Sequence, residues 1–406
     1  MQRKSRSPLL LMALTILIDF IGFGLIIPLL PFWAEHVGAT PVGVGLILTV
    51  YAIAQFVCTP LLGSLSDRYG RKPVIVASLI LETCSFVLTA LAGNLPLLLC
   101  ARFLGGIGAS NIGSAQAVVA DVTDAKNRAS GMGMIGASIG LGFVIGPLLG
   151  GILAPLGTTL PFWVAGGLAL INALLVILFL PETRQQRTGS AVRQNLLRGW
   201  GSVLHTPAIL TLISVNLLFT LAFTAMEAVF SLFSQKTFGW GASQNGYIFT
   251  YIGIIIVLMQ GGLVGQLVKR WNERGVMLVG LLLLAVGLIM LAFSQQFALL
   301  LVSLALLSIG EGAVTPTVST LLSFASSQEK QGEILGLSQG LAGLGRAVGP
   351  VAAGLAYMFY PGTPFIIGGI LVLLAFLVAV SNRSHLHQPV HLMGGERIPV
   401  GGEISH

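Results

Sequence analysis

Charge is the scarcest property of this 406-residue chain, since Asp, Glu, Lys and Arg together make up only 9% of it. Soluble globular proteins carry charge on about 25% of their residues, because their exterior must face water. Hydrophobic residues account for 55% of the chain, and the mean hydropathy is +0.91. The composition therefore excludes a soluble protein and makes lipid the solvent for most of the chain.

Cysteine is also scarce, and a common nucleotide-binding motif is missing. The 3 cysteines, Cys58, Cys84 and Cys100, each fall inside an apolar run. Such positions favour small buried hydrophobic side chains over a disulfide or a metal site. No G-x-x-x-x-G-K-[ST] motif occurs, so the chain lacks a P-loop for ATP hydrolysis. We expect no metal, no cofactor and no enzymatic activity.

The sequence does contain continuous apolar runs of about 20 residues, the length of a membrane-spanning helix. Barrel strands would instead alternate apolar and polar residues over about ten positions. The class is therefore an all-α membrane protein. Twelve spans are predicted, at residues 9–33, 43–65, 73–93, 96–120, 130–153, 160–180, 207–234, 243–268, 275–294, 297–323, 331–357 and 363–381.

The basic residues fall almost entirely on one side of these spans. Of the 21 basic residues, 18 precede the first span or follow an even-numbered one, Lys236 stands alone in the other loops, and Arg102 and Arg346 lie within spans. By the positive-inside rule, both termini and the 182–206 loop are cytoplasmic. This topology accounts for the net charge of +7, so nucleic-acid binding is not required. Short loops indicate a bacterial plasma (inner) membrane.

The two halves of the sequence repeat each other. At a shift of 203 residues, Gly133, Gly140, Gly142, Gly146, Pro147 and Gly151 fall on Gly336, Gly343, Gly345, Gly349, Pro350 and Gly354. Parallel repeats of six helices can rock about a site at their interface, which is a design of transporters. We predict two pseudo-symmetric six-helix bundles, at 1–181 and 207–382, with a cytoplasmic linker at 182–206 and a tail at 383–406.

The loop between the second and third spans carries an ordered motif, G-x-L-x-D-R-x-G-R-K, that ends at Lys72. Its basic residues alone would suit any cytoplasmic loop, but the whole pattern resembles the signature loop of the major facilitator superfamily. The resemblance extends over essentially the whole chain and implies the twelve-helix fold of that family. It also implies a breakable charge network that gates the cytoplasmic side, formed by Asp67, Arg68, Gly70, Arg71 and Lys72.

The fifth span carries the pattern G-x-x-x-G-P-x-x-G-G, formed by Gly142, Gly146, Pro147, Gly150 and Gly151. Glycines four residues apart let helices pack closely, and close packing alone would account for them. The whole pattern is similar to the motif of drug–proton antiporters in the same superfamily, and most similar to tetracycline-efflux-like members. Arg102 and Gly106 in span four are similar to the R-x-x-x-G motif of that group.

Six ionisable residues lie inside predicted spans, where each would cost roughly 2.5–3.5 kcal/mol at the helix centre. They are Asp19, Glu82, Arg102, Glu227, Glu311 and Arg346. Such groups must face a wet cavity, pair, or take a neutral form. A carboxyl group that gains and loses a proton beside an arginine could couple proton entry to substrate exit. The alternative is a set of ion pairs that only hold helices together.

The family resemblance implies that helices one, four, seven and ten line the cavity, and four of these residues fall on those helices. Glu82, in span three, lies roughly one turn from the acidic residue of tetracycline exporters, which leaves a peripheral position as the alternative. Arg346, in span eleven, is a candidate partner for Glu311.

Polar, aromatic and thioether side chains near these spans are candidates for substrate binding: Gln55, Asn111, Gln116, Asn216, Met226 and Tyr251, with Tyr247 and Gln260 beside them. Singly, each is explained as well by packing or by a hydrogen bond between helices. Together they predict a mixed apolar and polar pocket for amphipathic organic molecules.

These observations favour a secondary active transporter that exports small amphipathic compounds or drugs in exchange for protons, by alternating access. The expected partners are the lipid bilayer, a small-molecule substrate and protons, and a monomer is expected to suffice. Two alternatives stay open: a metabolite symporter or facilitator of the same fold, and a membrane sensor that does not transport. A preserved gating loop argues against the sensor, since a static scaffold needs none.

Overall fold

The computed structural model describes residues 7–183, 206–326 and 331–382, and every regular element in these ranges is helical. The first half contains α1 (Ser7–Ile26), α2 (Leu30–His36), α3 (Pro41–Tyr69), α4 (Arg71–Leu91), α5 (Leu95–Gly108), η1 (Ala109–Asn111), α6 (Ile112–Val122), α7 (Ala125–Leu153), η2 (Ala154–Leu156) and α8 (Leu160–Phe179). The second half contains α10 (Pro207–Phe238), α11 (Ala242–Leu258), η3 (Met259–Leu263), α12 (Val264–Ala292), α13 (Phe297–Ala325), α14 (Gln331–Tyr357) and α15 (Thr363–Ser381).

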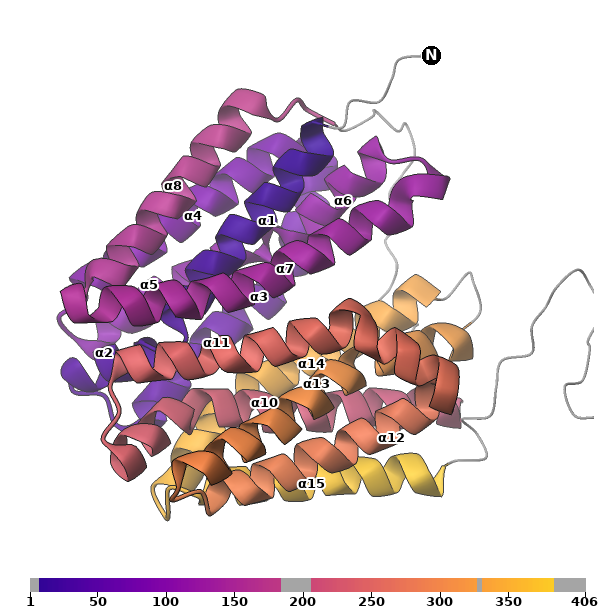
Figure 1. Ribbon diagram of the computed structural model, residues 1–406. Helices are drawn as coiled ribbons and strands as arrows, with labels where there is room; N and C mark the ends of the chain where they lie inside the picture. Colours follow the sequence, from indigo (N-terminus) through magenta and orange to yellow (C-terminus); the bar gives the residue numbers. More distant parts are fainter. Residues whose placement is uncertain (1–6, 184–205, 327–330, 383–406) are drawn as a thin grey trace, which may run out of the picture.

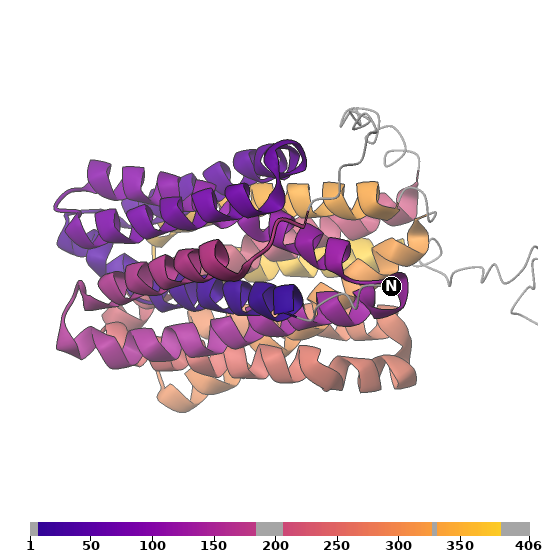
Figure 2. The same cartoon turned by 90° about the horizontal axis from the view of Figure 1, so that it is seen from above.

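Helices α1–α8 pack together as one bundle, and α10–α15 pack as a second (Figure 1). In the first, α1 packs against α7 and α8; in the second, α10 packs against α14 and α15. Between the bundles, α3 packs on α14 and α7 on α11, and the long helices run in a broadly common direction (Figure 2). The predicted class is confirmed. The linker at 182–206 and the tail at 383–406 lie almost wholly outside the described residues and stay predictions.

The number of spans also agrees with the prediction. Ten helical segments are long and apolar enough to cross a membrane, and one of them, Ala242–Ala292, runs for 51 residues. This segment holds two spans, because its backbone leaves helical geometry at Gly262 and Asn272 and the chain reverses (Figure 1). Asn272 has a φ of 57°, and its Oδ1 accepts a hydrogen bond from the Gly275 amide at 2.9 Å. Helix α14 completes the twelve.

The outer surface of the bundles is apolar, as lipid requires. On α8, for example, Leu174 is 48% exposed and Leu178 is 71% exposed. The same reason corrects the expectation that the cysteines are buried. Cys84 and Cys100 are exposed and Cys58 is partly exposed, all as free thiols, because an apolar side chain in a membrane protein can face lipid instead of the core.

The glycines of the antiporter-like motif bring α7 against α1. A Cβ atom on Gly146 would lie 2.7 Å from the backbone oxygen of Ile21, and one on Gly150 would lie 2.7 Å from that of Leu25. Gly142, one turn earlier on the same face, also meets α1. Any side chain at these positions would force the two helices apart, so the motif has a packing role in this structure.

The second half repeats this arrangement, as the sequence repeat predicts. Gly349 of α14 meets α10 as Gly146 of α7 meets α1, with a Cβ position 2.8 Å from the oxygen of Leu221. Gly151 faces α11 of the other bundle, and its counterpart Gly354 faces α3. The two halves therefore use equivalent glycines for equivalent contacts.

The interfaces between the bundles obey the same repeat. Pro147 lies inside α7, and its carbonyl oxygen lies 2.7 Å from the Cβ position of Gly246 in α11. Pro350 lies inside α14 and directs its carbonyl oxygen in the same way at Gly45 of α3. Backbone meets backbone at both places, so the bundles are in close contact there.

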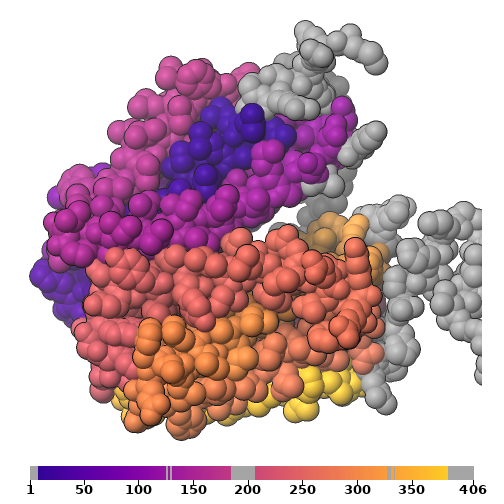
Figure 3. Space-filling model, viewed as in Figure 1, coloured from indigo at the N-terminus to yellow at the C-terminus, as the bar shows by residue number. Residues whose placement is uncertain are grey.

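The bundles touch at one end and separate at the other (Figures 1 and 3). We name the end that holds residues 67–72 the basic end, and the other the opposite end. Hydrogen bonds from Thr49 to the Ala347 oxygen at 2.5 Å and from Ser231 to the Pro28 oxygen at 3.3 Å join the bundles between their middle and the opposite end.

Glycines one turn apart mark where the bundles separate. In α7, a Cβ on Gly140 would meet α11 at 3.0 Å, whereas one on Gly136, a turn nearer the basic end, would meet nothing within 4 Å. In α14, Gly340 would meet α3 at 3.7 Å, and Gly336 would meet nothing within 4 Å. The bundles therefore diverge from the middle toward the basic end.

The substitutions Gly146→Ala and Gly136→Ala test the role of glycine in α7. In both variants the change from glycine to alanine favours the helical backbone by about 1 kcal/mol. Only Gly146→Ala also pushes a methyl group into α1. We expect Gly146→Ala to lower the free energy of unfolding by about 1–3 kcal/mol and Gly136→Ala to leave it unchanged or higher. Thermal unfolding in detergent measures both, and equal melting temperatures would contradict the packing role.

Candidate functional site

Asp19, in the middle of α1, is held by two asparagine side chains. Asn111 Nδ2 donates to Asp19 Oδ2 at 2.9 Å, and Asn172 Nδ2 donates to Asp19 Oδ1 at 2.8 Å. Asn111 ends η1, the 3-10 turn that interrupts the fourth span, and Asn172 lies on the otherwise apolar α8. The asparagines are 3% and 0% exposed. Each carboxylate oxygen therefore has an N–H partner from a different helix.

Arg102 and Glu82 lie on α5 and α4, near the aspartate and its two asparagines, and are 2% and 4% exposed. The Arg102 guanidinium lies over the Tyr51 ring, 4.5 Å from its centroid, and interacts electrostatically with Glu82. Glu82 in turn interacts with Asp19. Within the described residues, Arg102 Nε and Glu82 Oε2 have no hydrogen-bond partner. Because the Glu82 side chain is buried between helices, it does not take the peripheral position that the sequence left as an alternative.

Tyr51 joins this charged group to an aromatic cluster. Phe23 stacks on Tyr51 with ring centroids 5.5 Å apart, and Phe143 lies 6.0 Å from Phe23 and 5.3 Å from Phe20. The four rings come from α1, α3 and α7 and are all partly exposed. An apolar surface therefore adjoins Arg102.

The second bundle holds a separate charged group. Glu227 on α10 interacts electrostatically with both Glu311 of α13 and Arg346 of α14. Thr315 donates to Glu311 Oε1 at 3.0 Å, while Glu311 Oε2 has no hydrogen-bond partner among the described residues. The proposed pairing of Arg346 with Glu311 is therefore corrected to Glu227, because α14 packs closely on α10 and only slightly on α13.

Arg71 is the centre of a network at the basic end. Its Nη1 lies 2.6 Å from Asp67 Oδ1 and donates to Ser66 Oγ at 2.7 Å, and its Nε lies 3.3 Å from Asp121 Oδ2. These partners come from α3 and α6, so one guanidinium ties three helix ends together. All of them belong to the first bundle.

Glu182, just after α8, completes this network at the same end of the bundle. Its carboxylate accepts the backbone N–H groups of Arg71 at 2.9 Å and Lys72 at 3.2 Å, at the N-terminus of α4. Gly70 has a φ of 110°, and a Cβ there would lie 2.5 Å from Glu182 Oε2, so only glycine fits. The Arg68 guanidinium lies 5.3 Å from the centroid of the Tyr69 ring.

The candidate substrate-binding residues do not form one wall. Asn111, Asn216, Gln55 and Tyr251 direct their side chains into hydrogen bonds with Asp19, Ser338, Ala109 and Leu301, respectively. Met226 is 1% exposed and belongs to the core of the second bundle. Gln116, Tyr247 and Gln260 are exposed.

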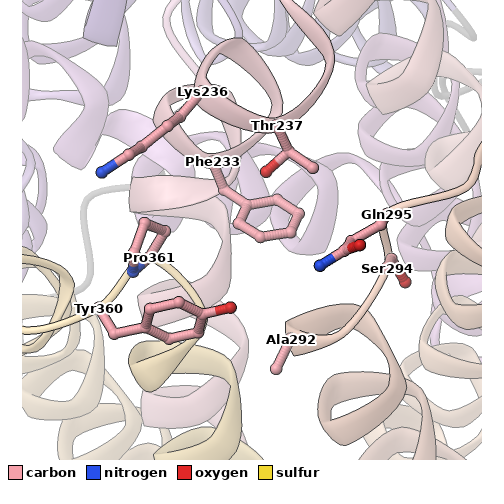
Figure 4. A pocket seen from close by; sticks show the side chains of 8 residues that line it. All are labelled: Phe233, Lys236, Thr237, Ala292, Ser294, Gln295, Tyr360 and Pro361. Atoms are coloured by element: carbon pink, nitrogen blue, oxygen red, sulfur yellow. The ribbon is translucent and has the colours of Figure 1, made fainter.

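A cavity of about 240 Å³ lies at the opposite end, away from both charged groups. Figure 4 shows the rings of Phe233 and Tyr360 and the Gln295 amide around it. The lining residues are Phe233, Lys236, Thr237, Ala292, Ser294, Gln295, Tyr360 and Pro361. It is an open pocket between the ends of α10 and α12 and the turn between α14 and α15, all in the second bundle.

Glu35, on α2, reaches across the opposite end to the second bundle, where it hydrogen-bonds to the Gln235 side chain of α10. Partial burial raises the pKa of Glu35 above its usual value, and the bond to Gln235 opposes this rise. The contact adds a polar link to the backbone contacts that close this end.

Sequence analysis missed Tyr51, Asn172, Thr315 and Glu182. Asn172 had a usable signal, because it is the one amide side chain in the apolar run at 160–180. Thr315 had a weaker one, since it follows Glu311 by one helical turn. Tyr51 and Glu182 had none: an aromatic in an apolar run suits any core, and the contact of Glu182 with α4 joins residues 110 or more positions apart.

Comparison with known proteins agrees with this architecture. Residues 12–275 and 261–391 match the family model described as Major Facilitator Superfamily. The chain is 30% identical to the tetracycline resistance protein, class C, of Escherichia coli, over 91% of this chain and 96% of that protein. It is 28% identical to multidrug resistance protein 2 of Bacillus subtilis (strain 168), over 91% and 94% of the two chains.

Solved structures show the same fold. The human organic anion transporter MFSD10 (TETRAN) is 26% identical, with a TM-score of 0.69 over 93% of this chain and 100% of that one. The nucleoside transporter NupG is 13% identical, with a TM-score of 0.76 over 93% of this chain and 98% of that one. The chain therefore belongs to the Major Facilitator Superfamily and is a multi-pass membrane transporter.

Proposed function

We propose that this transporter exports small amphipathic organic compounds in exchange for protons, by alternating access of one central site. The observation that carries the proposal is the pair of charged groups inside the membrane, one in each bundle. Among the described residues, neither group closes into an ion pair within 4 Å. Groups held for stability alone would be expected to pair, since an unpaired buried charge is costly.

Buried carboxyl groups with an oxygen that lacks a hydrogen-bond partner suit proton exchange. Glu82 Oε2 and Glu311 Oε2 each lack a hydrogen-bond partner within the described residues, so each leaves an oxygen to which a proton can be added. Arg102 interacts with Glu82, and Arg346 interacts with Glu227. Each arginine keeps its charge throughout and stabilises its carboxylate when the proton leaves. A proton or a cationic substrate can then neutralise the same site in turn, which is the requirement for exchange.

Orientation follows from the distribution of positive charge, which assigns the basic end to the cytoplasm. The bundles diverge toward that end, so the arrangement described here is inward-open. A substrate can enter from the cytoplasm and leave outward after the bundles rock. A monomer suffices, because both walls of the site come from one chain.

The substrate class is supported by the surface beside the charged group. The rings of Phe20, Phe23, Tyr51 and Phe143 offer apolar contact, and Arg102 offers charge. The relatives named as tetracycline and multidrug resistance proteins support the same class. The proposed binding residues remain Gln55, Asn111, Gln116, Asn216, Met226 and Tyr251, with Asn111 acting through Asp19.

The network around Arg71 serves as the gate of the basic end. It holds the loop at residues 67–72 in a fixed shape within the first bundle, ready to dock on the second bundle when this end closes. Closing this end would form contacts at residues 67–72 and break the backbone contacts at the opposite end, so that one end is sealed at a time.

Proton coupling is tested with Asp19→Asn and Glu311→Gln in proteoliposomes. We expect both variants to lose the uptake of a tetracycline or a cationic dye that an imposed pH gradient drives, because neither amide can bind a proton. Exchange of labelled for unlabelled substrate without a gradient should persist. Glu273→Gln, an acid-to-amide change in the turn after Asn272, is the control. Full gradient-driven uptake by both variants would refute the coupling.

The gate is tested with Arg71→Lys. A lysine cannot contact Asp67 and Asp121 at once from a fixed planar fork, so we expect the transport rate to fall several-fold while the protein remains folded. Arg128→Lys is the matched control, because Arg128 is exposed and its side chain makes one hydrogen bond with a described residue, to the Ala120 oxygen at the same end. Equal rates for the two variants would argue against a gate at Arg71.

Orientation is tested with single cysteines in a background whose three native cysteines are replaced by serine. Gly93→Cys lies at the opposite end and Asn127→Cys at the basic end, and both positions are exposed. We expect a membrane-impermeant maleimide to label Gly93→Cys on intact cells and Asn127→Cys only after the cells are opened. The reverse pattern would invert the topology.

A further inference from the structure

The two asparagines that hold Asp19 are not equivalent. Asn172 Nδ2 donates to Asp19 Oδ1 at 2.8 Å and also to the Thr15 backbone oxygen at 3.1 Å. Both partners are acceptors, so the amide of Asn172 has one orientation, because turning it would set its oxygen against two others. Asn111 Nδ2 makes a single hydrogen bond within the described contacts, to Asp19 Oδ2 at 2.9 Å.

The hydrogen-bonding needs of Asp19 change when it takes a proton. An ionised carboxylate only accepts, and here each oxygen accepts one N–H. A protonated carboxyl must donate from one oxygen, and an O–H cannot point at an N–H. The protonated oxygen keeps a lone pair for an N–H, but its O–H needs an acceptor of its own, and an amide that turns its oxygen toward Asp19 supplies one. Asn111 is the one that can turn, since it gives up one bond and its own oxygen can then accept the proton of Asp19.

We infer that Asn111 is a positioning residue that converts the protonation state of Asp19 into a movement of η1, while Asn172 holds Asp19 in place. The inference rests on the proposed function, because it requires Asp19 to exchange protons. Asn111 is the last residue of η1, and a 3-10 segment inside a longer helix is a place where a span can flex.

From η1 the movement has a physical route to the other bundle. Gln55 of α3 donates its side-chain N–H to the backbone oxygen of Ala109 at 3.2 Å, and Ser110 Oγ donates to the backbone oxygen of Gln55 at 3.2 Å. Helix α3 is in turn packed on α14 of the second bundle. A shift of η1 therefore acts on a helix of the interface between the bundles.

The other titratable groups around Asp19 are few. Glu82 from α4 and Tyr51 from α3 interact with its charge, and Arg102 from α5 acts on both. Helix α8 contains no titratable side chain, and α6 and α7 carry theirs only at the basic end, with Asp121 as the nearest on α6. The amides are thus the groups in direct contact that must respond when Asp19 changes charge.

The experiment uses Gly113→Cys as a reporter in the background that lacks the native cysteines. Gly113 follows η1 in α6, and a Cβ there would meet nothing within 4 Å, so the thiol fits. The maleimide labelling rate of this thiol is measured against pH in the purified full-length protein. The rate at each pH is divided by that of the exposed Asn127→Cys thiol, because a maleimide reacts with the thiolate and every labelling rate rises with pH. We expect this ratio to change with pH in the parent and to lose that change in Asp19→Asn, which cannot be protonated.

Two nearly isosteric variants test the two asparagines that donate to Asp19 separately. Asn111→Leu should abolish the pH-dependent change in labelling, and Asn172→Leu should retain a change, with its midpoint moved toward higher pH by about one unit, since the carboxylate has lost one N–H donor. Asn245→Ala removes a buried asparagine whose side chain is bonded, in the described part of the chain, to Gly241 and Ser234, and serves as the control for reduced stability. Its labelling profile should match the parent.

The outcomes distinguish this inference from the proposed function. A normal pH response in Asn111→Leu, with Asp19→Asn unresponsive, would overturn the role of Asn111 and leave proton exchange at Asp19 intact. If Asp19→Asn itself keeps the parent response and the parent gradient-driven uptake, the proposed coupling fails as well. If Asn111→Leu unfolds, Asn111→Ser, which keeps a group able to donate or accept, replaces it and should restore part of the pH response; none at all would overturn the inference.

Discussion

A charge inside the membrane must be satisfied by groups that the surrounding helices bring to it, and this requirement organises the interior of the protein. Asp19 receives amides from η1 and α8, Arg102 lies over a tyrosine ring of α3, and Glu227 interacts with an acid of α13 and a base of α14. In each case the partners come from helices other than the one that carries the charge. The charged groups therefore depend on the packing of the whole bundle, and a change in packing alters their environment directly.

Glycine makes that packing possible. Gly142 of α7 meets Phe20, the neighbour of Asp19, with a Cβ position 2.5 Å from the phenylalanine Cβ. The antiporter-like motif thus lies directly behind the aspartate and fixes the helix that presents it. At the same time Gly151, on another face of α7, contacts α11 of the second bundle. One helix therefore supports the segment that carries Asp19 and also contacts the second bundle.

How much of this the sequence predicted depends on whether a feature lies in one helix or between two. Span positions were predictable because bilayer thickness sets the length of an apolar run, and the shared fold of the halves was visible in their glycines. Contacts between side chains were not, because the rotation of each helix and its offset from its neighbours leave no trace in its own periodicity. Arg346 was assigned to Glu311 for this reason, and the contact of Asn172 with Asp19 was missed although the asparagine itself stood out. The prediction that the cysteines are buried was wrong for a different reason, because an apolar run does not show which face of the helix packs in the core and which faces lipid.

The charged residues, unlike the glycines, do not follow the repeat. At the same shift of 203 residues, Asp19, Glu82, Arg102, Glu227, Glu311 and Arg346 stand opposite Ala222, Ala285, Ala305, Gly24, Gly108 and Phe143. Gly108 shows why the two sets exclude each other, since a Cβ there would lie 3.0 Å from the Cβ of Glu82. A glutamate at position 108 to match Glu311 would therefore displace Glu82. The interfaces between the bundles are built from repeated residues and the charged groups from unrepeated ones, so the two bundles share a shape while each carries a different set of charges.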